Sequence, residues 1–361
     1  MPISSPESDA GPRLTPNGRR GFLTRLLATG AAGASSSVAA AADAPTEAAP
    51  ARRIDTHHHF FSPTYVKALD AHGLAVPIVK NWSIEKTLAD MDKAGVATAV
   101  LSVTTPQVGF VADVAEAQRL ARESNEYAAE LGRSHPGRFG SFAMLPMQSS
   151  DAALAELAYA LDVLKADGIG LLTSYGNKWL GHLDFAPVLD ELNQRKAVLY
   201  THPTVAPCCI DLLPNVPPTV VEFGTDTTRT IVDIVFSGTA ARCPDMNFIF
   251  SHAGGTLPFL TERLQKMPLL DKTLAARVPN GVLHELQRFH YDTAWSANRY
   301  ALPSLLELVG TPHLLFGSDY PYRTGADNIA GLIDSGKFSS AELEAIGRGN
   351  ALRLLPGLHS Q

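Results

Sequence analysis

The sequence predicts an α/β fold of the (β/α)8 type, a TIM barrel like that of metal-dependent hydrolases, and two observations support this prediction. From residue 53 onward, short apolar runs alternate with amphipathic stretches, which indicates parallel βαβ units. Eight such apolar runs occur, and eight parallel units favour a closed barrel over an open sheet. An open doubly wound sheet is the alternative, but no GxGxxG motif follows a strand to support it.

The expected strands are short and mostly continuous in apolar residues, as strands buried on both faces should be. They are expected at residues 54–57, 98–103, 139–145, 168–172, 197–202, 247–252, 288–292 and 313–316. Helical periodicity lies between them, most clearly at 151–165, where Asp151 is the expected N-cap, and at 227–240. Longer insertions at 70–83 and 204–225 are expected to shape a substrate pocket.

Length and composition limit the classes of function. The chain has 361 residues and 45% hydrophobic residues, enough for a sizeable core in one barrel domain, expected over residues 51–361. The net charge of −6 and the lack of a basic run with interleaved aromatics argue against nucleic-acid binding. Cys208, Cys209 and Cys243 form neither a disulfide framework nor a CxxC zinc motif, so buried or loop thiols are expected.

The first fifty residues are expected to lie outside the barrel. They contain Arg19-Arg20, then a weakly hydrophobic stretch, then the small residues Ala40-Ala41-Ala42. This order is typical of a twin-arginine export signal, which would place the mature bacterial protein in the periplasm or otherwise outside the cytoplasm. A disordered Ala-rich tail with a chance arginine pair is the alternative. No later run of about 18 apolar residues occurs, so no integral membrane segment is expected in the mature chain.

Four of the expected strands end in side chains that can bind a metal. These are His57 and His59 on the first strand, His202 on the fifth, His252 on the sixth and Asp319 after the eighth. The carboxyl ends of barrel strands meet at one open face, so these side chains are expected around a common centre. Each residue alone could be an ordinary buried polar group, but four independent strand ends favour a site for one divalent ion.

The histidine run on the first strand predicts a specific geometry. Alternate side chains of a strand share a face, so His57 and His59 should point together while His58 points away. Asp55 lies on the same face as the pair. It is therefore expected to orient one of these two imidazoles by accepting a hydrogen bond.

Taken together, these motifs resemble the amidohydrolase superfamily, and within it the branch of aminocarboxymuconate semialdehyde decarboxylase. The resemblance rests on residues 54–59, 201–203, 251–259 and 317–321. It extends over essentially the whole chain from Arg53 to the end. Residues 171–176 and 226–239 further resemble the 6-methylsalicylate decarboxylases of that branch.

The resemblance implies a role for each strand-end residue. It assigns the metal ligands as His57, His59, His202 and Asp319, and the catalytic histidine as His252. Asp319 would also deliver a proton to the substrate. Relatives with two metals carry a carbamylated lysine at the end of the fourth strand, where this chain has Thr173 and Ser174. A single ion, Zn²⁺ or Mn²⁺, is therefore expected.

The expected reaction is the non-oxidative decarboxylation of a small hydroxyaromatic or muconate-type carboxylic acid. A divalent ion could chelate the carboxylate and an ortho oxygen while the ring carbon takes up a proton. Two alternatives stay open, because the motifs do not separate them. One is a mononuclear metal-dependent hydrolase of a small ester, lactone or amide, and the other is a non-catalytic exported metal-binding barrel. The resemblance also implies a homodimer as one option.

Several side chains near these motifs are candidate substrate contacts. Arg323 and Arg229 could pair with a carboxylate, and Phe60 and Trp179 could stack on a ring. Phe61, Trp295 and Tyr322 are further aromatic candidates of the same kind. A surface ion pair for each arginine and core packing for each ring are the alternative interpretations.

Overall fold

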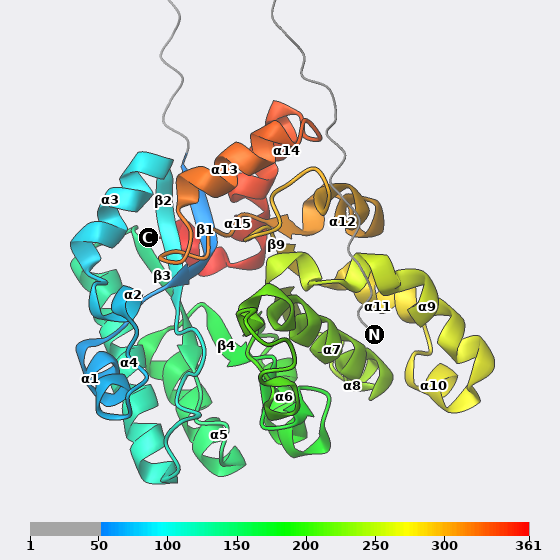
Figure 1. Cartoon of the computed structure of the whole chain (residues 1–361), viewed down its shortest axis with the longest axis horizontal. Helices are drawn as coiled ribbons and strands as arrows, with labels where there is room; N and C mark the ends of the chain where they lie inside the picture. The colour runs from blue at the N-terminus through cyan, green and yellow to red at the C-terminus, as the bar shows by residue number, and fades with distance from the viewer. Residues whose placement is uncertain (1–51, 361) are drawn as a thin grey trace, which may run out of the picture. The chain divides into compact units, whose positions relative to one another are not determined.

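The computed structural model describes residues 52–360, and within this range eight parallel strands form one sheet (Figure 1). The spatial order of the strands follows the chain. They are β1 (Arg53–His59), β2 (Val96–Ser102), β3 (Phe139–Met144), β4 (Gly168–Leu172), β7 (Val198–His202), β8 (Asn247–Phe250), β9 (His290–Asp292) and β10 (Leu314–Leu315). A short antiparallel hairpin, β5 (Ser174–Tyr175) and β6 (Lys178–Trp179), follows β4. The expected export signal lies outside the described residues.

The two edges of the sheet meet, which closes the barrel. The amide of Thr56 donates to the carbonyl of Phe316 at 2.9 Å, and the amide of Asp319 donates to the carbonyl of His57 at 2.8 Å. The segment that includes β10 and the residues after it therefore completes the sheet against β1. This confirms the predicted (β/α)8 barrel, with the carboxyl ends of the strands at one mouth.

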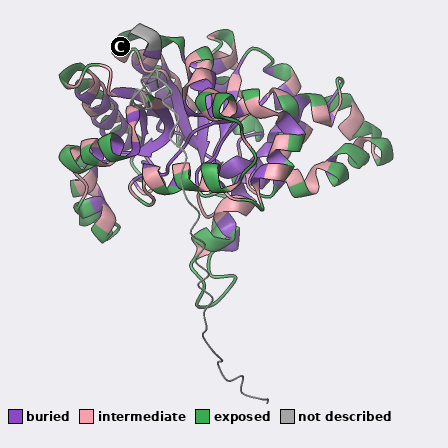
Figure 2. Ribbon diagram, turned by 90° about the horizontal axis from the view of Figure 1, so that it is seen from above, coloured by how far each residue is buried: buried purple, intermediate pink, exposed green. Residues whose placement is uncertain are grey.

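Helices surround the barrel, and Figure 2 shows buried strands inside a layer of helices whose outer faces are exposed. The helices are α1 (Pro63–Ala71), α2 (Pro77–Lys80), α3 (Ile84–Ala94), α4 (Val114–Ser134), α5 (Ser150–Tyr159), α6 (Ala186–Gln194), α7 (Glu222–Phe236), α8 (Thr239–Arg242), α9 (Leu257–Leu270), α10 (Lys272–Arg277), α11 (Val282–Arg288), α12 (Leu302–Val309), α13 (Gly325–Asp334), α14 (Ser340–Glu344) and α15 (Asn350–Leu354). None of the helices in residues 52–360 combines the length and apolarity that crossing a bilayer requires.

The barrel interior is filled by side chains. Phe142 of β3 stacks on Tyr200 of β7 with ring centroids 5.2 Å apart. Residues of α15 and the segment after it, including Ala351 and Leu355, pack into the same apolar cluster. The interior is thus a packed core rather than a pore, and the mouth at the carboxyl ends is left for chemistry.

Two expected boundaries need correction. The helix expected at 151–165 begins at Ser150, because the hydroxyl of Ser149 accepts from the amide of Ala152 and is the N-cap, whereas Asp151 lies inside the first turn. That helix also changes to a π-helix over Ala160–Leu164. The helix expected at 227–240 is α7, which starts earlier, at Glu222, and is followed by the separate α8.

The strand expected at 247–252 is also shorter than predicted. β8 ends at Phe250, and the chain turns sharply so that His252 begins a short 3-10 segment with φ of +54°. The insertions at 70–83 and 204–225 contain α2 and two 3-10 turns, respectively. The second insertion carries Cys208, which is exposed, and Cys209, which is buried, both as free thiols.

Candidate metal centre

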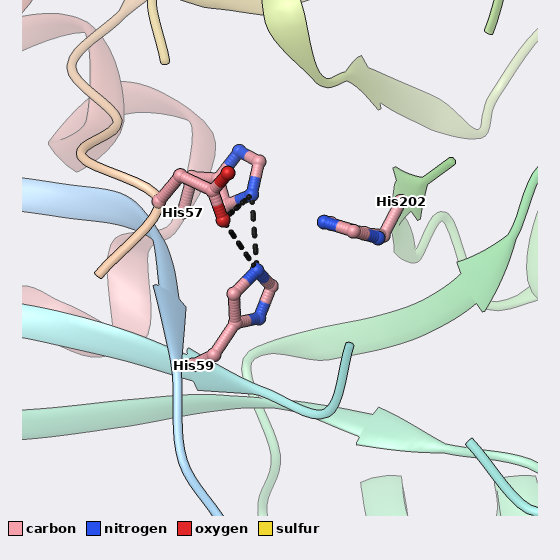
Figure 3. A group of neighbouring side chains, drawn as sticks. His57, His59 and His202 are labelled. Atoms are coloured by element: carbon pink, nitrogen blue, oxygen red, sulfur yellow. Dashed lines mark hydrogen bonds and ion pairs between the residues drawn. The ribbon is translucent and has the colours of Figure 1, made fainter. Parts of the chain in front are cut away.

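The four expected metal ligands meet at the mouth of the barrel. They are His57, His59, His202 and Asp319, all buried, and their ligand atoms lie within 4.8 Å of one another. Nε2 of His57 lies 3.2 Å from Nε2 of His59. Oδ1 of Asp319 lies 3.2 Å from the first of these nitrogens and 2.9 Å from the second. Figure 3 shows His202 pointing toward the other two imidazoles from a different strand.

Backbone geometry explains how β1 and the segment after β10 present these groups. His58 faces away from the centre and stacks on Tyr320 at 4.7 Å, as strand alternation predicts. Asp319 has φ of +67°, a conformation that a non-glycine residue adopts at a cost. A Cβ at Gly317 would lie 2.8 Å from the Cβ of His57, so only glycine lets this segment lie so close to β1.

The carboxylate that orients a ligand ring is Asp292, at the end of β9, and not Asp55. The Nδ1–H of His57 donates to Oδ2 of Asp292 at 2.8 Å, with both side chains fully buried. The carboxylate of Asp55 instead accepts from Nδ1 of His58 at 2.9 Å and from the amide of Ser318 at 3.0 Å. Asp292 ends the seventh expected strand, so the strand-end rule could have found it.

Each of the three imidazoles has its Nδ1 engaged, which fixes its tautomer. Besides the bond from His57, Nδ1 of His59 donates to the carbonyl of Ser102 at 3.2 Å, and Nδ1 of His202 donates to the carbonyl of Pro203 at 2.9 Å. A carbonyl oxygen can only accept, so Nδ1 carries the proton in both rings and Nε2 carries a lone pair.

This arrangement fits a bound cation. The facing Nε2 atoms of His57 and His59, at 3.2 Å, repel unless a positive charge lies between them. Oδ1 of Asp319 is buried and makes no regular hydrogen bond within residues 52–360. Three imidazole nitrogens and one carboxylate oxygen form a donor set that divalent zinc or manganese accepts.

The pKa shifts of His57 and Asp319 favour a positive charge at this centre, whereas the shift of His202 keeps that imidazole neutral. Burial works against the charged form of His57, but Asp292 and Asp319 outweigh it and raise its pKa to about 10. Burial, followed by the neighbouring histidines, holds the pKa of His202 well below its usual range. Burial alone would raise the pKa of Asp319, but the charge on His57, followed by the close contacts with His252, His57 and His59, holds it well below its usual range. A divalent ion would satisfy this demand in place of a proton.

His252 lies beside the four residues rather than among them. Its Nε2 is 3.4 Å from Oδ2 of Asp319, and its ring centroid is 4.9 Å from that of His57. Its backbone amide donates to Oδ1 of Asp292 at 3.0 Å, which anchors the turn that carries it. From this position the imidazole can exchange a proton with a molecule bound at the centre.

Aromatic side chains form the rim of the mouth. The indole N–H of Trp295 donates to Oδ2 of Asp319 at 2.6 Å. The ring of Tyr322 lies 6.0 Å from that of His59, and the ring of Phe223 lies 5.9 Å from that of His202. Sequence reasoning gave Trp295 only a general stacking role, because its contact with Asp319 depends on the fold.

Of the four candidate substrate contacts, one lies at the rim of the mouth, one in the core and two beside a separate cavity. Arg323 lies at the rim, with its guanidinium 5.7 Å from the ring centre of Trp295. Phe60 does not face the site, because it is 1% exposed and stacks in the core on Tyr127, so the expectation of a substrate contact is corrected to core packing.

Trp179 and Arg229 are engaged with other partners. The indole N–H of Trp179 donates to Asp226 at 2.6 Å, and Arg229 pairs with Glu222 at 3.2 Å. The two side chains line a cavity of about 410 Å³ together with residues of α7 and α10, and that cavity includes none of the four clustered residues. A substrate role for either would require these contacts to change.

A larger cavity lies on the carboxyl side of the barrel. It has a volume of about 650 Å³ and is lined by residues that follow β2, β3 and β7 and by the end of β4, among them Pro106, Met147, Leu172 and Thr204. Thr204 is two residues beyond His202. The volume falls in the range that accommodates small organic ligands.

Comparison with known proteins identifies the family. The profile of the family described as Amidohydrolase matches residues 54–357. The chain belongs to the amidohydrolase family. Decarboxylase macB of Penicillium terrestre is 38% identical over 324 residues, which cover 84% of this chain and 95% of that protein. The 6-methylsalicylic acid decarboxylase of Penicillium expansum is 35% identical over 315 residues, which cover 85% and 97%. These relatives support an enzyme of the carboxy-lyase class.

Solved structures of this amidohydrolase fold agree with the barrel. An amidohydrolase II structure aligns with a TM-score of 0.76 at 27% identity, over 84% of this chain and 99% of that chain. A 2,6-dihydroxybenzoate decarboxylase aligns at 0.75 and 23% identity, over 84% and 98%. A 5-carboxyvanillate decarboxylase of Novosphingobium aromaticivorans complexed with manganese aligns at 0.75 and 20% identity, over 84% and 96%. At these two lower identities the likeness establishes the fold.

Proposed function

We propose that this amidohydrolase is a metal-dependent, non-oxidative decarboxylase of a small hydroxyaromatic carboxylic acid. The observation that carries the proposal is the convergence of three imidazoles and the carboxylate of Asp319 at the barrel mouth, with His252 beside them. The relatives named as 6-methylsalicylic acid decarboxylases, which align over nearly their whole length, support the same reaction class.

The proposed cofactor is one divalent ion, Mn²⁺ or Zn²⁺, held by His57, His59, His202 and Asp319. When bound, such an ion supplies Lewis acidity and a template for a carboxylate and its ortho oxygen. Manganese in the 5-carboxyvanillate decarboxylase structure supports the first choice, and the histidine-rich donor set suits either metal. Thr173 and Ser174 at the end of β4 support a single ion, since neither can bridge two metals as a carbamylated lysine does.

The reaction needs a proton at the ring carbon that bears the carboxylate. Once that carbon is protonated, the bond to the carboxylate breaks, carbon dioxide leaves, and the electron pair returns to the ring. Asp319 is proposed to deliver this proton through Oδ2. Because the pKa of Asp319 lies well below its usual range, it would carry the proton only transiently, after taking it from Nε2 of His252 at 3.4 Å. His252 is proposed to hold or return the proton between turnovers.

The remainder of the substrate would occupy the mouth. Arg323 is the proposed partner of a substrate carboxylate or other anionic group, because its guanidinium lies at the rim beside Trp295. The cavity of about 650 Å³ offers space for ring substituents.

A panel of salicylates and other hydroxybenzoates tests the proposal. The metal-loaded protein should release carbon dioxide from at least one ring acid, and metal analysis should find one Mn²⁺ or Zn²⁺ per chain. Turnover of esters, lactones or amides without carbon dioxide release would indicate the hydrolase alternative. A His252→Ala protein that keeps its metal and loses all turnover would exclude the non-catalytic alternative, whereas an unchanged rate would remove His252 from the mechanism.

We also propose export of this protein through the twin-arginine pathway, supported by Arg19-Arg20 and the small residues that follow in the sequence. Replacing both arginines with lysine should retain the protein in the cytoplasm of a bacterial host.

A homodimer is proposed as well. Exposed apolar side chains on α9 support it, since Phe259 is 89%, Leu269 82% and Leu270 80% exposed. Light scattering after size-exclusion chromatography would decide the oligomeric state.

A further inference from the structure

The two oxygens of Asp319 have different neighbours, and Trp295 contacts only one of them. Oδ1 faces the ligand nitrogens of His57 and His59 at 3.2 and 2.9 Å. Oδ2 faces away from these two nitrogens, toward the indole N–H of Trp295 at 2.6 Å and Nε2 of His252 at 3.4 Å. The indole N–H therefore contacts the carboxylate oxygen that does not face the metal position.

The backbone holds both partners in place at a conformational cost. Trp295 has φ of +55° and Asp319 has φ of +67°, and left-handed backbone is rare for a bulky residue such as tryptophan. The loop that carries Trp295 is anchored at its start, where the amide of Ala294 donates to Oδ1 of Asp292 at 3.0 Å. Asp292 also orients His57, so one buried carboxylate sets the position of the loop and of a proposed ligand. Such strain persists where surrounding contacts over-determine it.

The exposure of Trp295 indicates that the hydrogen bond, rather than core packing, is its main contribution. Its side chain is 54% exposed at the mouth, whereas a tryptophan that stabilises the core would be buried. Indole has a single polar atom, which can only donate, and here it donates to a carboxylate. A hydrogen bond to a charged acceptor is stronger than one to a neutral acceptor.

We propose that Trp295 is a positioning residue for Asp319. Its N–H holds the carboxylate so that Oδ1 faces the metal position and Oδ2 stays beside His252, where a proton can be exchanged. This inference rests on the proposed metal-dependent decarboxylation, and it goes beyond that proposal by assigning the orientation of the carboxylate to one donor on the loop after β9.

The Trp295→Phe variant tests the inference, because it keeps an aromatic ring but removes the N–H donor together with the five-membered ring of the indole. The dissociation constant for Mn²⁺, measured by competition with a chromophoric chelator, should rise about tenfold, as for other lost partners of metal ligands. At saturating Mn²⁺, kcat should fall about tenfold or more while KM changes less than about threefold, because the lost contact acts on Asp319 and not on the substrate. Circular dichroism should show the wild-type fold.

Trp82→Phe is the matched control. The indole nitrogen of Trp82 is buried and has no hydrogen-bond partner within residues 52–360, and the ring packs against Phe61 at 6.2 Å. Removing that N–H should leave the Mn²⁺ dissociation constant, kcat and KM within about twofold of wild type, since no bond is lost.

Fluorescence adds a readout that needs no substrate. Paramagnetic Mn²⁺ quenches a nearby indole, so titration should quench wild-type and Trp82→Phe emission, and the response should fall by more than half in Trp295→Phe. Wild-type values of metal affinity, kcat and quenching in Trp295→Phe would overturn the inference. A wild-type protein that binds Mn²⁺ with Trp295-dependent quenching but releases no carbon dioxide would overturn the proposed reaction and still support the position of Trp295. Wild-type protein that binds no Mn²⁺ would overturn both.

Discussion

Asp292 Oδ2 accepts the Nδ1–H of His57 at 2.8 Å, and neither side chain has any exposed surface. The other oxygen of Asp292 accepts from the amides of His252 and Ala294, at 3.0 Å in each case. One carboxylate therefore sets the orientation of a proposed metal ligand, the turn that carries the proposed catalytic histidine, and the loop that carries Trp295. We infer that the geometry of the site depends on Asp292 as much as on the ligands.

The first prediction follows from this bond. Asp292→Asn keeps the shape of the side chain but removes the charge that favours the Nδ1–H tautomer of His57. The affinity for Mn²⁺ should fall about 10- to 100-fold, as expected when the partner of a ligating histidine is lost. Competition with a chromophoric chelator measures this. Asp184→Asn, which changes a half-exposed carboxylate paired with Lys178, is the control and should bind metal as wild type does. An Asp292→Asn protein with wild-type affinity would contradict the assigned role.

The second prediction concerns metal removal. A ligand that binds only the folded state stabilises it, by about 2.7 kcal/mol when present at 100 times its dissociation constant. Removing the metal with a chelator should therefore lower Tm by about 5 °C in a protein of this size. His59→Ala should show almost no difference between chelated and Mn²⁺-loaded samples, because a buried ligand is missing. His72→Ala, at an exposed histidine, should respond as wild type does. Equal Mn²⁺ responses in His59→Ala and wild type would place the metal elsewhere.

The sequence predicted that the four proposed ligands would lie together, because they obey a local rule. His57, His202 and Asp319 each lie at or just beyond the end of an apolar run, and parallel strands bring such ends to one face. Asp55 shows where a second rule, the alternation of side chains along a strand, fails. Strict alternation would place it with His57 and His59, but the pairing of β1 with β2 has a register irregularity between Asp55 and His58, and the carboxylate lies beside His58.

Contacts between distant segments could not be read from the sequence. Phe60 packs on Tyr127, a residue of α4, and that pairing exists only once the helix covers β1. The bond from Trp295 to Asp319 joins two loops that follow different strands. Neither contact has a periodicity or a motif, so only the three-dimensional arrangement separates a core ring from a ring at the site.

The third prediction is a pH dependence away from the site. Asp167 precedes β4 at the amino end of the barrel, accepts from the amide of Ser141 at 2.9 Å, and is largely buried, which raises its pKa to about 6. A raised pKa means that the folded state holds the proton more tightly than the unfolded state. The ionised form therefore reduces stability, with no effect below pH 4 and the full effect above pH 6.

Asp167→Asn should remove this cost. At pH 7.5 the free energy of unfolding in urea should rise by about 1–2 kcal/mol, less than the roughly 2.7 kcal/mol of two pKa units because water reaches part of the side chain. At pH 4 the variant and wild type should unfold alike. The difference between the two pH values isolates the charge from any change in packing, so an equal gain at both would show that the charge of Asp167 is not its cause.

The fourth prediction concerns the buried carboxylate of Asp226, which lies against the end of β4. Asp226 of α7 is fully buried and accepts hydrogen bonds from the hydroxyls of Thr173 and Ser174 and from the indole of Trp179. The amide of Thr173 in turn donates to the carbonyl of His202 at 2.9 Å. Asp226 thus supports the backbone of His202, a proposed ligand, through Thr173, and it is not one of the four clustered residues.

Asp226→Ala should leave three donors, two of them buried, without an acceptor and lower the free energy of unfolding by about 2–4 kcal/mol. Asp226→Asn, which keeps one acceptor oxygen, should lower it by about 1–2 kcal/mol. Urea unfolding of the metal-free proteins measures both. Because β7, which ends at His202, stays paired with β4 along its length, Mn²⁺ affinity should fall less in Asp226→Asn than in Asp292→Asn. A larger fall of Mn²⁺ affinity in Asp226→Asn than in Asp292→Asn would mean that Asp226, rather than Asp292, controls the geometry of the proposed metal centre.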